Sequence, residues 1–134
     1  MSAEENRKLV LMFCRYLSER KLDPMFALLS EDSNWSAVGQ PETFKYGGPK
    51  TKSRSVEFIS AFLNAFKDFR FDVQSSTADG DRVAIEATSR GTGAKGNIYE
   101  NQYLLIFRCR DGLIINIREF FDQMAVLTYE KKEF

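Results

Sequence analysis

The sequence of 134 residues contains no histidine, and this absence limits the chemistry that the protein can perform. Every catalytic triad and every metal site that depends on an imidazole is excluded. Cysteine is also scarce: only Cys14 and Cys109 occur, and two cysteines alone do not make a zinc site. Both lie in apolar patterns, which favours buried, reduced thiols and a cytoplasmic protein. Any catalysis must therefore use carboxylates, Tyr, Lys, Arg or Cys.

An excess of charge of either sign is missing as well. Lys plus Arg and Asp plus Glu number 19 each, so the formal net charge is zero. We expect no nucleic-acid partner, because such partners require a basic surface. The first residues lack the basic and apolar regions of a signal peptide, and no apolar run approaches the ~20 residues of a membrane span. We therefore expect no membrane association.

The chain has the length and composition of one globular domain, residues 1–134. Apolar residues make up 43% of it, which is ordinary for such a domain. The aromatic content is high, with twelve Phe, five Tyr and one Trp. These rings are available to fill a core or to line a pocket.

The first half of the sequence predicts three helices. Ser2 and Glu5 form a capping box that opens a helix to about Arg20. Asp23-Pro24 opens a short helix to about Leu29. An amphipathic pattern over residues 55–69 predicts the third helix. A short strand over 34–38 and a long irregular loop over 39–54 connect them, and a loop of this length is either a lid or a solvated connector.

The second half of the sequence shows only the alternating pattern of strands. Asp111-Gly112 is a two-residue hairpin turn between two long strands. Helices followed by an antiparallel sheet indicate an α+β fold with the helices on one face of the sheet. The strand patterns cover residues 71–74, 83–89, 98–110 and 113–122.

Glu119 lies in the last of these strands, where successive side chains point to opposite faces. Ile115, Ile117, Glu119 and Phe121 therefore share one face, and burial would raise the pKa of this carboxyl toward the range useful for acid–base chemistry. Such a carboxylate either contacts a ligand or satisfies neighbouring side chains for structural reasons. A bulge near residue 118 would bring Asp122 into the pocket in its place.

The last two long strands are apolar on both faces, and both faces need cover. The helices can cover only one of them. We expect the outer face to be buried against a second copy of the chain, as a homodimer with salt bridges from Arg118, Glu86 and Asp122. The apolar residues of this outer face are Leu104, Ile106, Ile114 and Phe120.

Three helices and a strand with Trp35 precede four motifs: Gly80-Asp81-Arg82-Val83-Ala84-Ile85-Glu86, Tyr99-Glu100-Asn101-Gln102-Tyr103, Asp111-Gly112 and Ile117-Arg118-Glu119-Phe120-Phe121-Asp122. This arrangement resembles the SnoaL-like branch of the nuclear transport factor 2-like superfamily over nearly the whole chain. The resemblance implies a cone-shaped α+β barrel, in which three N-terminal helices wrap a curved antiparallel sheet around a deep pocket, and a homodimer. The superfamily holds polyketide cyclases, ketosteroid isomerases, epoxide hydrolases and non-enzymatic binding domains, so fold alone does not determine activity.

The resemblance to ketosteroid isomerases is partial. Their oxyanion-binding tyrosine on the first helix matches Tyr16, although the apolar face of this helix favours a core tyrosine instead. Their aspartate base falls on Ser36-Ala37, and residues 101–110 contain no acid to match their second oxyanion donor. The resemblance therefore predicts no ketosteroid isomerase activity.

Two other branches match at Glu119 alone. In limonene-type epoxide hydrolases, the last-strand aspartate matches Glu119, but their Arg and other Asp fall on Ala87 and Ser89. Their Tyr and Asn are replaced by Trp35 and Ala37. SnoaL-like cyclases use an acid near the Glu119 position for proton transfer during ring closure, and Glu119 fits this role.

We therefore expect a mostly apolar pocket that binds a small, largely apolar organic molecule. If there is chemistry, it is cofactor-free proton transfer of the isomerase or cyclase type, with Glu119 as acid–base and Tyr16 or Asn101 as donors. The alternative is a non-enzymatic ligand-binding or association module, in which Asn101 and Tyr103 only hold strands together. The small Ser89 leaves room in the pocket, whose further lining is Trp35, Phe58, Phe62, Ile85, Tyr103, Ile117 and Phe121.

Overall fold

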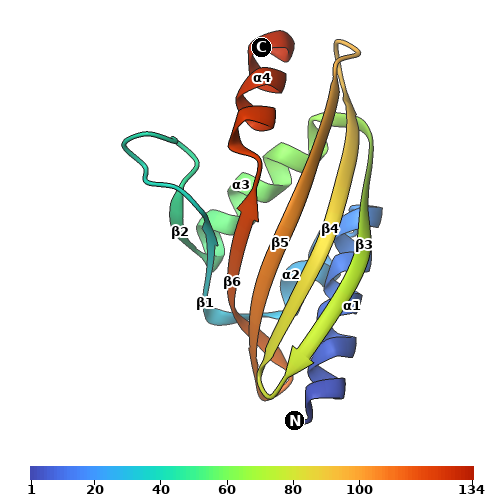
Figure 1. Ribbon diagram of the computed structural model, residues 1–134, viewed down its shortest axis with the longest axis vertical. Coiled ribbons are helices and arrows are strands. Elements are labelled where there is room, and N and C mark those ends of the chain that lie inside the picture. The colour runs from blue at the N-terminus through green and yellow to red at the C-terminus, as the bar shows by residue number, and fades with distance from the viewer.

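The computed structural model describes residues 1–134 as an α+β fold, in which helices cover the concave face of one curved sheet (Figure 1). The fold class is as predicted. The six strands have the order β2-β1-β6-β5-β4-β3, and the edge strands β2 and β3 do not pair with each other. The expected barrel is therefore an open, curved sheet. The strands are β1 (Leu29–Ala37), β2 (Gly48–Thr51), β3 (Phe66–Asp79), β4 (Arg82–Gly93), β5 (Ile98–Arg110) and β6 (Leu113–Phe121).

One strand pair departs from the antiparallel pattern. β1 lies parallel to β6, while all other neighbours in the sheet are antiparallel. The long segment between these strands, which contains α3 and the other four strands, makes the parallel pairing possible, because parallel strands need a long crossover connection. The segment expected to be a loop also contributes, since residues 48–51 form β2 on the far side of β1.

The first helix, α1 (Ala3–Glu19), has both hydrogen bonds of the predicted Ser2–Glu5 capping box. The second, α2, covers Leu22–Ala27. The third, α3 (Lys52–Asn64), lies earlier in the chain than its pattern indicated. Thr51 caps it by accepting a hydrogen bond from the backbone N–H of Arg54, and Phe66 already begins β3.

A fourth helix, α4 (Gln123–Glu133), follows β6 directly. Asp122 caps it, because its side chain accepts hydrogen bonds from the backbone N–H groups of Met124 and Ala125. The Gln123 side chain donates to the carbonyl oxygen of Val38 at 2.7 Å, which fixes the start of α4 beside the end of β1. None of the helices is both long and apolar enough to cross a membrane.

A β-bulge in β6 determines which residues face inward. Arg108 pairs with Asn116 and Cys109 pairs with Ile114, so Ile115 is an extra residue without a partner on β5. Ile115 therefore does not share the face of Ile117, and Ile114, predicted on the outer face, is fully buried in the core. Because the bulge precedes Ile117, the alternation of Ile117, Glu119 and Phe121 remains intact.

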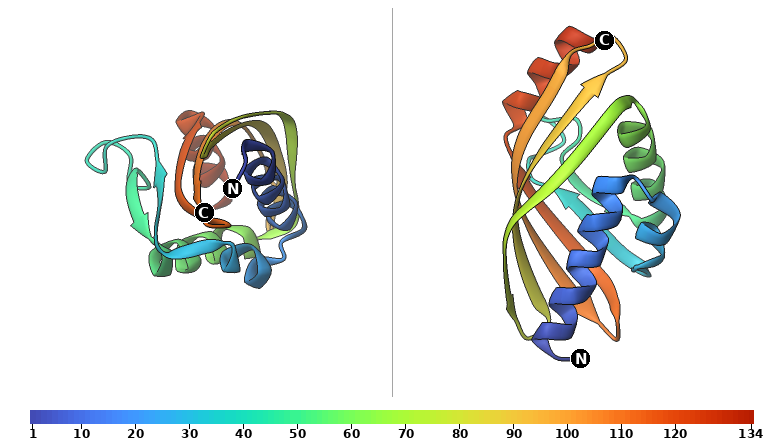
Figure 2. Two further views of the ribbon diagram at one scale, coloured as in Figure 1. Left: turned by 90° about the horizontal axis from the view of Figure 1, so that it is seen from below. Right: turned by 90° about the vertical axis from the view of Figure 1, so that its right-hand side faces the viewer.

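The hydrophobic core lies between α1 and the concave face of the sheet, as Figure 2 shows with α1 inside the curve of the strands. Phe13 of α1 is fully buried and packs edge-to-face on Trp35 at 5.6 Å and on Phe107 at 5.5 Å between ring centroids. The contact with Phe13 of the first helix therefore holds the ring of Trp35 in place.

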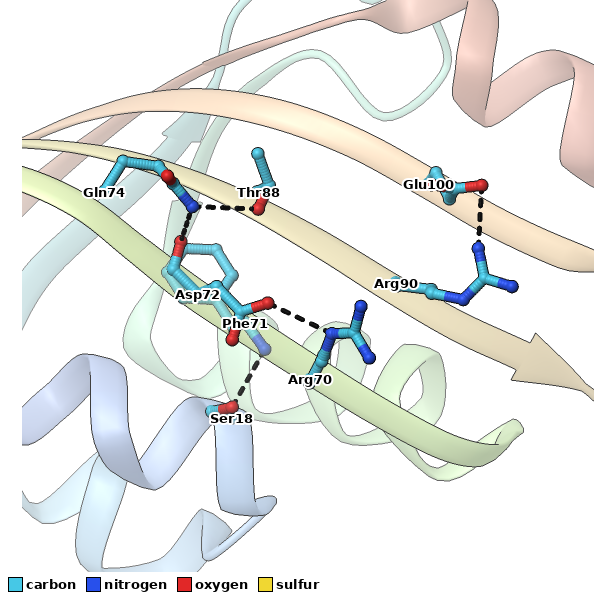
Figure 3. A network of polar contacts seen from close by, with 8 residues as sticks. All are labelled: Ser18, Arg70, Phe71, Asp72, Gln74, Thr88, Arg90 and Glu100. Atoms are coloured by element: carbon cyan, nitrogen blue, oxygen red, sulfur yellow. Dashed lines mark hydrogen bonds and ion pairs between the residues drawn. The ribbon is translucent and has the colours of Figure 1, made fainter.

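The outer face of the sheet divides into a polar and an apolar part. On β3, β4 and β5, exposed side chains pair with one another, including Arg70 with Asp72 at 3.1 Å and Arg90 with Glu100 at 2.9 Å (Figure 3). Toward β6 the face becomes apolar, with Leu104 40% exposed and Ile106 and Phe120 half-buried.

We predict that Phe13→Ala lowers the free energy of unfolding by about 3–5 kcal/mol, because a large buried ring is lost and two aromatic neighbours are left unpacked. Urea unfolding followed by circular dichroism measures this change. Met12→Ala on the exposed side of the same helix is the control, with an expected effect within about 0.5 kcal/mol. Equal losses in the two variants would contradict this account of the core.

Candidate functional site

A cavity of about 240 Å³ lies beside the core, at the end of the sheet that carries α4. Its walls come from α3, α4, the ends of β1, β5 and β6, and the segment between β1 and β2. Fourteen of the sixteen lining residues are hydrophobic, and the other two are Glu119 and Glu130. The hydrophobic lining consists of Ala37, Phe44, Tyr46, Phe58, Ile59, Ala61, Phe62, Ala65, Tyr99, Tyr103, Phe121, Val126, Tyr129 and Phe134.

Glu119 projects from β6 into this cavity. The indole Nε1 of Trp35 donates a hydrogen bond of 2.8 Å to its Oε1 atom, across the parallel pairing of β1 and β6. Oε2 makes no hydrogen bond within the protein. Glu119 is half-buried and lines the cavity, with one oxygen held by Trp35 and the other without a hydrogen-bond partner in the protein.

Burial raises the pKa of Glu119 from 4.5 to about 7. The hydrogen bond from Trp35 and the positive charge of Lys50 act in the opposite direction and keep the pKa from rising further. Lys50 forms no ion pair with Glu119. Its Nζ atom donates to the carbonyl oxygen of Tyr46 at 2.8 Å and lies 5.0 Å from the ring centroid of Phe58. Burial lowers the pKa of Lys50.

Glu130 is the second acid of the cavity wall, and it differs from Glu119 in its surroundings. Its Oε1 atom lies 3.5 Å from Nζ of Lys45, so it pairs with a cation at the rim. This ion pair joins α4 to the segment that carries Phe44 and Tyr46. Glu119 is therefore the carboxylate of the apolar interior, as the strand pattern predicted.

A second polar group lies along β5. The Tyr103 hydroxyl is 2.8 Å from Oγ of Ser89 and 3.1 Å from the Tyr99 hydroxyl. Nδ2 of Asn101 donates to the Tyr99 hydroxyl at 2.7 Å and to the carbonyl oxygen of Asp122 at 3.0 Å. Burial raises the pKa of Tyr99 to about 12 and that of Tyr103 well above its usual value. Both hydroxyls therefore remain protonated near neutral pH.

Several residues expected at the site lie together in the structure. Phe58, Phe62, Tyr103 and Phe121 line the cavity with Glu119. Trp35 is not part of the lining, but it holds Glu119 by a hydrogen bond. That these side chains contact a ligand stays a prediction.

The remaining expected residues lie outside the cavity wall. Ile85 and Ile117 are fully buried in the core, because the core and the cavity share the concave face of the sheet. Ser89 and Asn101 are buried in the hydroxyl network. Tyr16 packs on α1 against the core, and its hydroxyl makes no hydrogen bond within the protein.

Residues that the sequence interpretation missed make up much of the wall. Tyr99 shares strand parity with Tyr103, so its inward position had a signal in the sequence. Phe44 and Tyr46 come from the predicted loop, and no periodicity indicates which way they point. Val126, Tyr129 and Glu130 come from α4 and Phe134 directly follows it, and the position of this helix depends on contacts such as the one between Gln123 and Val38.

The site contains no group of three or more Cys, Asp or Glu side chains that could hold a metal ion, and the same is true of the rest of the chain. Its chemistry rests on one carboxylate, whose pKa lies near neutrality, and on neutral hydroxyl groups. Such a set can accept a proton, donate one and bind polar atoms of a small molecule.

Comparisons with solved structures confirm the fold. PrhC from Penicillium brasilianum NBRC 6234 superimposes with a TM-score of 0.86 at 20% identity, covering 98% of this chain and 89% of that one. An NTF2-like protein of unknown function from Burkholderia pseudomallei K96243 gives 0.81 at 20% identity, with 96% and 98% coverage. An LEH-like epoxide hydrolase of M. tuberculosis gives 0.77 at 19% identity, with 98% and 92% coverage. At these identities the likeness concerns the fold alone.

Sequence comparisons identify the family. UPF0523 protein C of Dictyostelium discoideum is 24% identical over 102 residues, which are 74% of this chain. The chain spans 65% of the length of that relative. The profile of the SnoaL-like domain matches residues 10–126. The chain therefore belongs to the SnoaL-like domain family, and it shares its fold with NTF2-like proteins.

Proposed function

We propose that this protein binds a small, largely apolar organic molecule in the cavity beside Glu119. The observation that carries the proposal is a carboxylate with one free oxygen in an otherwise apolar enclosure. Ligand sites usually combine a predominantly hydrophobic wall with a few polar groups that fix orientation. Glu119 would accept a hydrogen bond from a ligand hydroxyl or amine, while the aromatic rings of the wall would pack on its apolar body.

We further propose that Glu119 transfers a proton. With a pKa of about 7, the carboxylate and the carboxylic acid are both populated near neutral pH. The carboxylate would take a proton from one atom of the substrate and return it to another, with no change in oxidation state. An isomerisation or a ring closure of this kind requires no cofactor.

The alternative is a binding module without catalysis. This alternative is favoured by the absence of further catalytic groups. At the positions where related enzymes carry them, this chain has Ala87 and Ser89 on β4 and Ala37 on β1. Neither a second acid nor an arginine stands beside Glu119. In this case the carboxylate would only orient the ligand.

We also propose that two copies of the chain associate through the apolar part of the outer sheet face. Leu104 and Phe120 are cross-strand partners there, and Ile106 pairs with Arg118 in the next row. Arg118 and Glu86 are exposed and form no ion pair within the chain, so they can pair across a two-fold axis. Apolar area framed by unpaired charges of opposite sign fits a self-complementary interface.

The pKa of Glu119 leads to a prediction about stability. The folded protein holds this proton up to about pH 7, whereas the unfolded chain releases it near pH 4.5, so stability falls as the pH rises between these values. Because one pKa unit corresponds to about 1.4 kcal/mol, the wild type should lose up to about 3 kcal/mol relative to Glu119→Gln between pH 4.5 and pH 8. Urea unfolding across this range measures the difference. Parallel profiles for the two proteins would contradict the raised pKa.

Binding and proton transfer can be separated without knowing the natural ligand. We predict that 2-naphthol binds the wild type and that Glu119→Gln weakens binding about 10–100-fold, because a hydrogen bond to a charged group is lost. Ala37→Leu, which fills the cavity beside Glu119, should abolish binding, and Ala94→Leu at the exposed hairpin tip should not. Calorimetry measures the affinities.

In the same proteins, exchange of the α-protons of 2-tetralone in D₂O, followed by NMR, reports proton transfer. Faster exchange with the wild type than with Glu119→Gln supports catalysis. Binding without accelerated exchange favours the binding module. Absence of binding by both probes would remove the proposed function.

For the proposed dimer, we predict a mass of two chains by light scattering at micromolar concentration. Leu104→Glu should give a monomer, because it places like charges opposite each other in the interface. Met124→Glu on α4 is the control, since this side chain is 67% exposed and lies outside the face. A monomeric wild type would disprove the association.

A further inference from the structure

At the Asn101 end of the hydroxyl network on β5, the direction of the hydrogen bonds is fixed. Oδ1 of Asn101 accepts hydrogen bonds from the backbone N–H groups of Gln102 at 2.8 Å and Asp122 at 3.0 Å. Because a backbone N–H can only donate, the amide oxygen must face these two groups, and Nδ2 must face Tyr99. Asn101 therefore donates to the Tyr99 hydroxyl oxygen, and it has no acceptor left for a proton from Tyr99.

The hydrogens of the network can then be counted. Ser89, Tyr103 and Tyr99 carry three hydroxyl hydrogens. They make two hydroxyl–hydroxyl contacts, Ser89–Tyr103 and Tyr103–Tyr99, and each contact uses one hydrogen. The third hydrogen has no acceptor within the protein. It belongs to Ser89, Tyr103 or Tyr99, and rotation of the O–H bonds moves it among them without displacing a heavier atom.

Two of the three residues that carry these hydroxyl groups line the cavity. Tyr99 and Tyr103 belong to its wall, whereas Ser89 lies behind Tyr103 and is not part of the lining. Aromatic neighbours hold both rings in place: Tyr103 lies 5.4 Å from Phe71, and Tyr99 lies 5.7 Å from Phe62, between centroids. A buried donor without an acceptor is costly, so a ligand acceptor at this point would be stabilised.

The tyrosine pair lies close enough to Glu119 for one small molecule to contact both. On β5 and β6, Leu105 pairs with Glu119 and Tyr103 pairs with Phe121, so Tyr103 and Glu119 are diagonal neighbours on one face. Such neighbours lie about 7–8 Å apart, within reach of long side chains. The negative charge of Glu119 also raises the pKa of both tyrosines, which agrees with this proximity and keeps them protonated.

We propose that the Tyr99–Tyr103 pair is a hydrogen-bond donor site for a carbonyl-type oxygen of the ligand, opposite the acceptor site at Glu119. The inference rests on the proposed ligand-binding function and narrows its ligand class. The ligand would be an apolar molecule with a neutral acceptor oxygen at one point and a hydroxyl or acidic C–H group about one ring away. Specificity would then come from two polar points of opposite hydrogen-bonding character.

The test compares naphthalene with 2-acetylnaphthalene, which adds only an acceptor oxygen. At pH 8.5, Glu119 is mostly ionised and cannot donate to the ketone, while Tyr99 and Tyr103 can. The measured quantity is the ratio of the two dissociation constants, naphthalene over ketone. We expect Tyr99→Phe/Tyr103→Phe to lower this ratio about 3–10-fold relative to the wild type, with naphthalene affinity unchanged.

Two single variants sharpen the comparison. Thr128→Val removes an exposed hydroxyl of α4 that lies outside the cavity wall, and it should leave the ratio unchanged. Ser89→Ala removes the network hydroxyl outside the cavity and confines the spare hydrogen to the two tyrosines, so the ratio should not fall. A purely structural network would instead respond to Ser89→Ala as it does to loss of a tyrosine.

If the double variant does not fold, the infrared spectrum of the ketone bound to the wild type at pH 8.5 replaces it. The carbonyl stretching band of the bound ketone should lie at lower frequency than that of the ketone dissolved in an alkane, which offers no hydrogen-bond donor. An unchanged ratio or band, with naphthalene bound, would overturn the donor site and leave the proposed function intact. If neither probe binds the wild type, the proposed function falls, and the donor site falls with it.

Discussion

The register between β5 and β6 is the constraint on which the site depends. The extra residue Ile115 lets Ile114 and Ile117 both face the core, although three positions separate them. A strand without this bulge would place one of them on the outer face and leave a gap in the core. With the bulge, β6 fills the core with its first half and forms the cavity wall with its second half. Glu119 lies where these two environments meet.

This position explains how a carboxylate persists in an apolar enclosure. A buried charge is costly unless it is paired and hydrogen-bonded, and Glu119 has one hydrogen bond and a cation beyond ion-pair distance. The cost of burying the charged carboxylate remains, and as a result Glu119 binds a proton near neutral pH. The groups of the nearby hydroxyl network are neutral, so their burial does not carry the cost of a charge. The amide of Asn101 makes hydrogen bonds with both its nitrogen and its oxygen. The polar part of the cavity therefore holds little permanent charge.

Local patterns predicted the parts of the fold that local interactions determine. The capping box at Ser2, the turn at Asp111-Gly112 and the inward position of Glu119 each follow from neighbouring residues, and the structure contains all three. Patterns failed where distant contacts decide. The end of α3 depends on packing of Phe66 in the sheet, and the short β2 forms where β1 offers an edge, whereas the start of α3 is a local cap at Thr51 that the pattern missed. Eleven of the sixteen wall residues escaped prediction, and the four from the C-terminal segment did so for this reason, because α4 is held by contacts to Val38, Lys45 and Lys95.

The parallel pairing of β1 with β6 has a consequence for how the chain folds. Trp35 and Glu119 are separated by 84 positions, so their contact forms only after most of the chain has been synthesised. Contacts of such sequence separation slow folding, since a long loop must close before they contribute. Until β6 arrives, the hydrogen-bonding edge of β1 stays open to other strands, and during this interval the chain is most exposed to aggregation. The pairing of β6 with β1 closes this open edge and also completes the cavity, so the cavity forms late in folding.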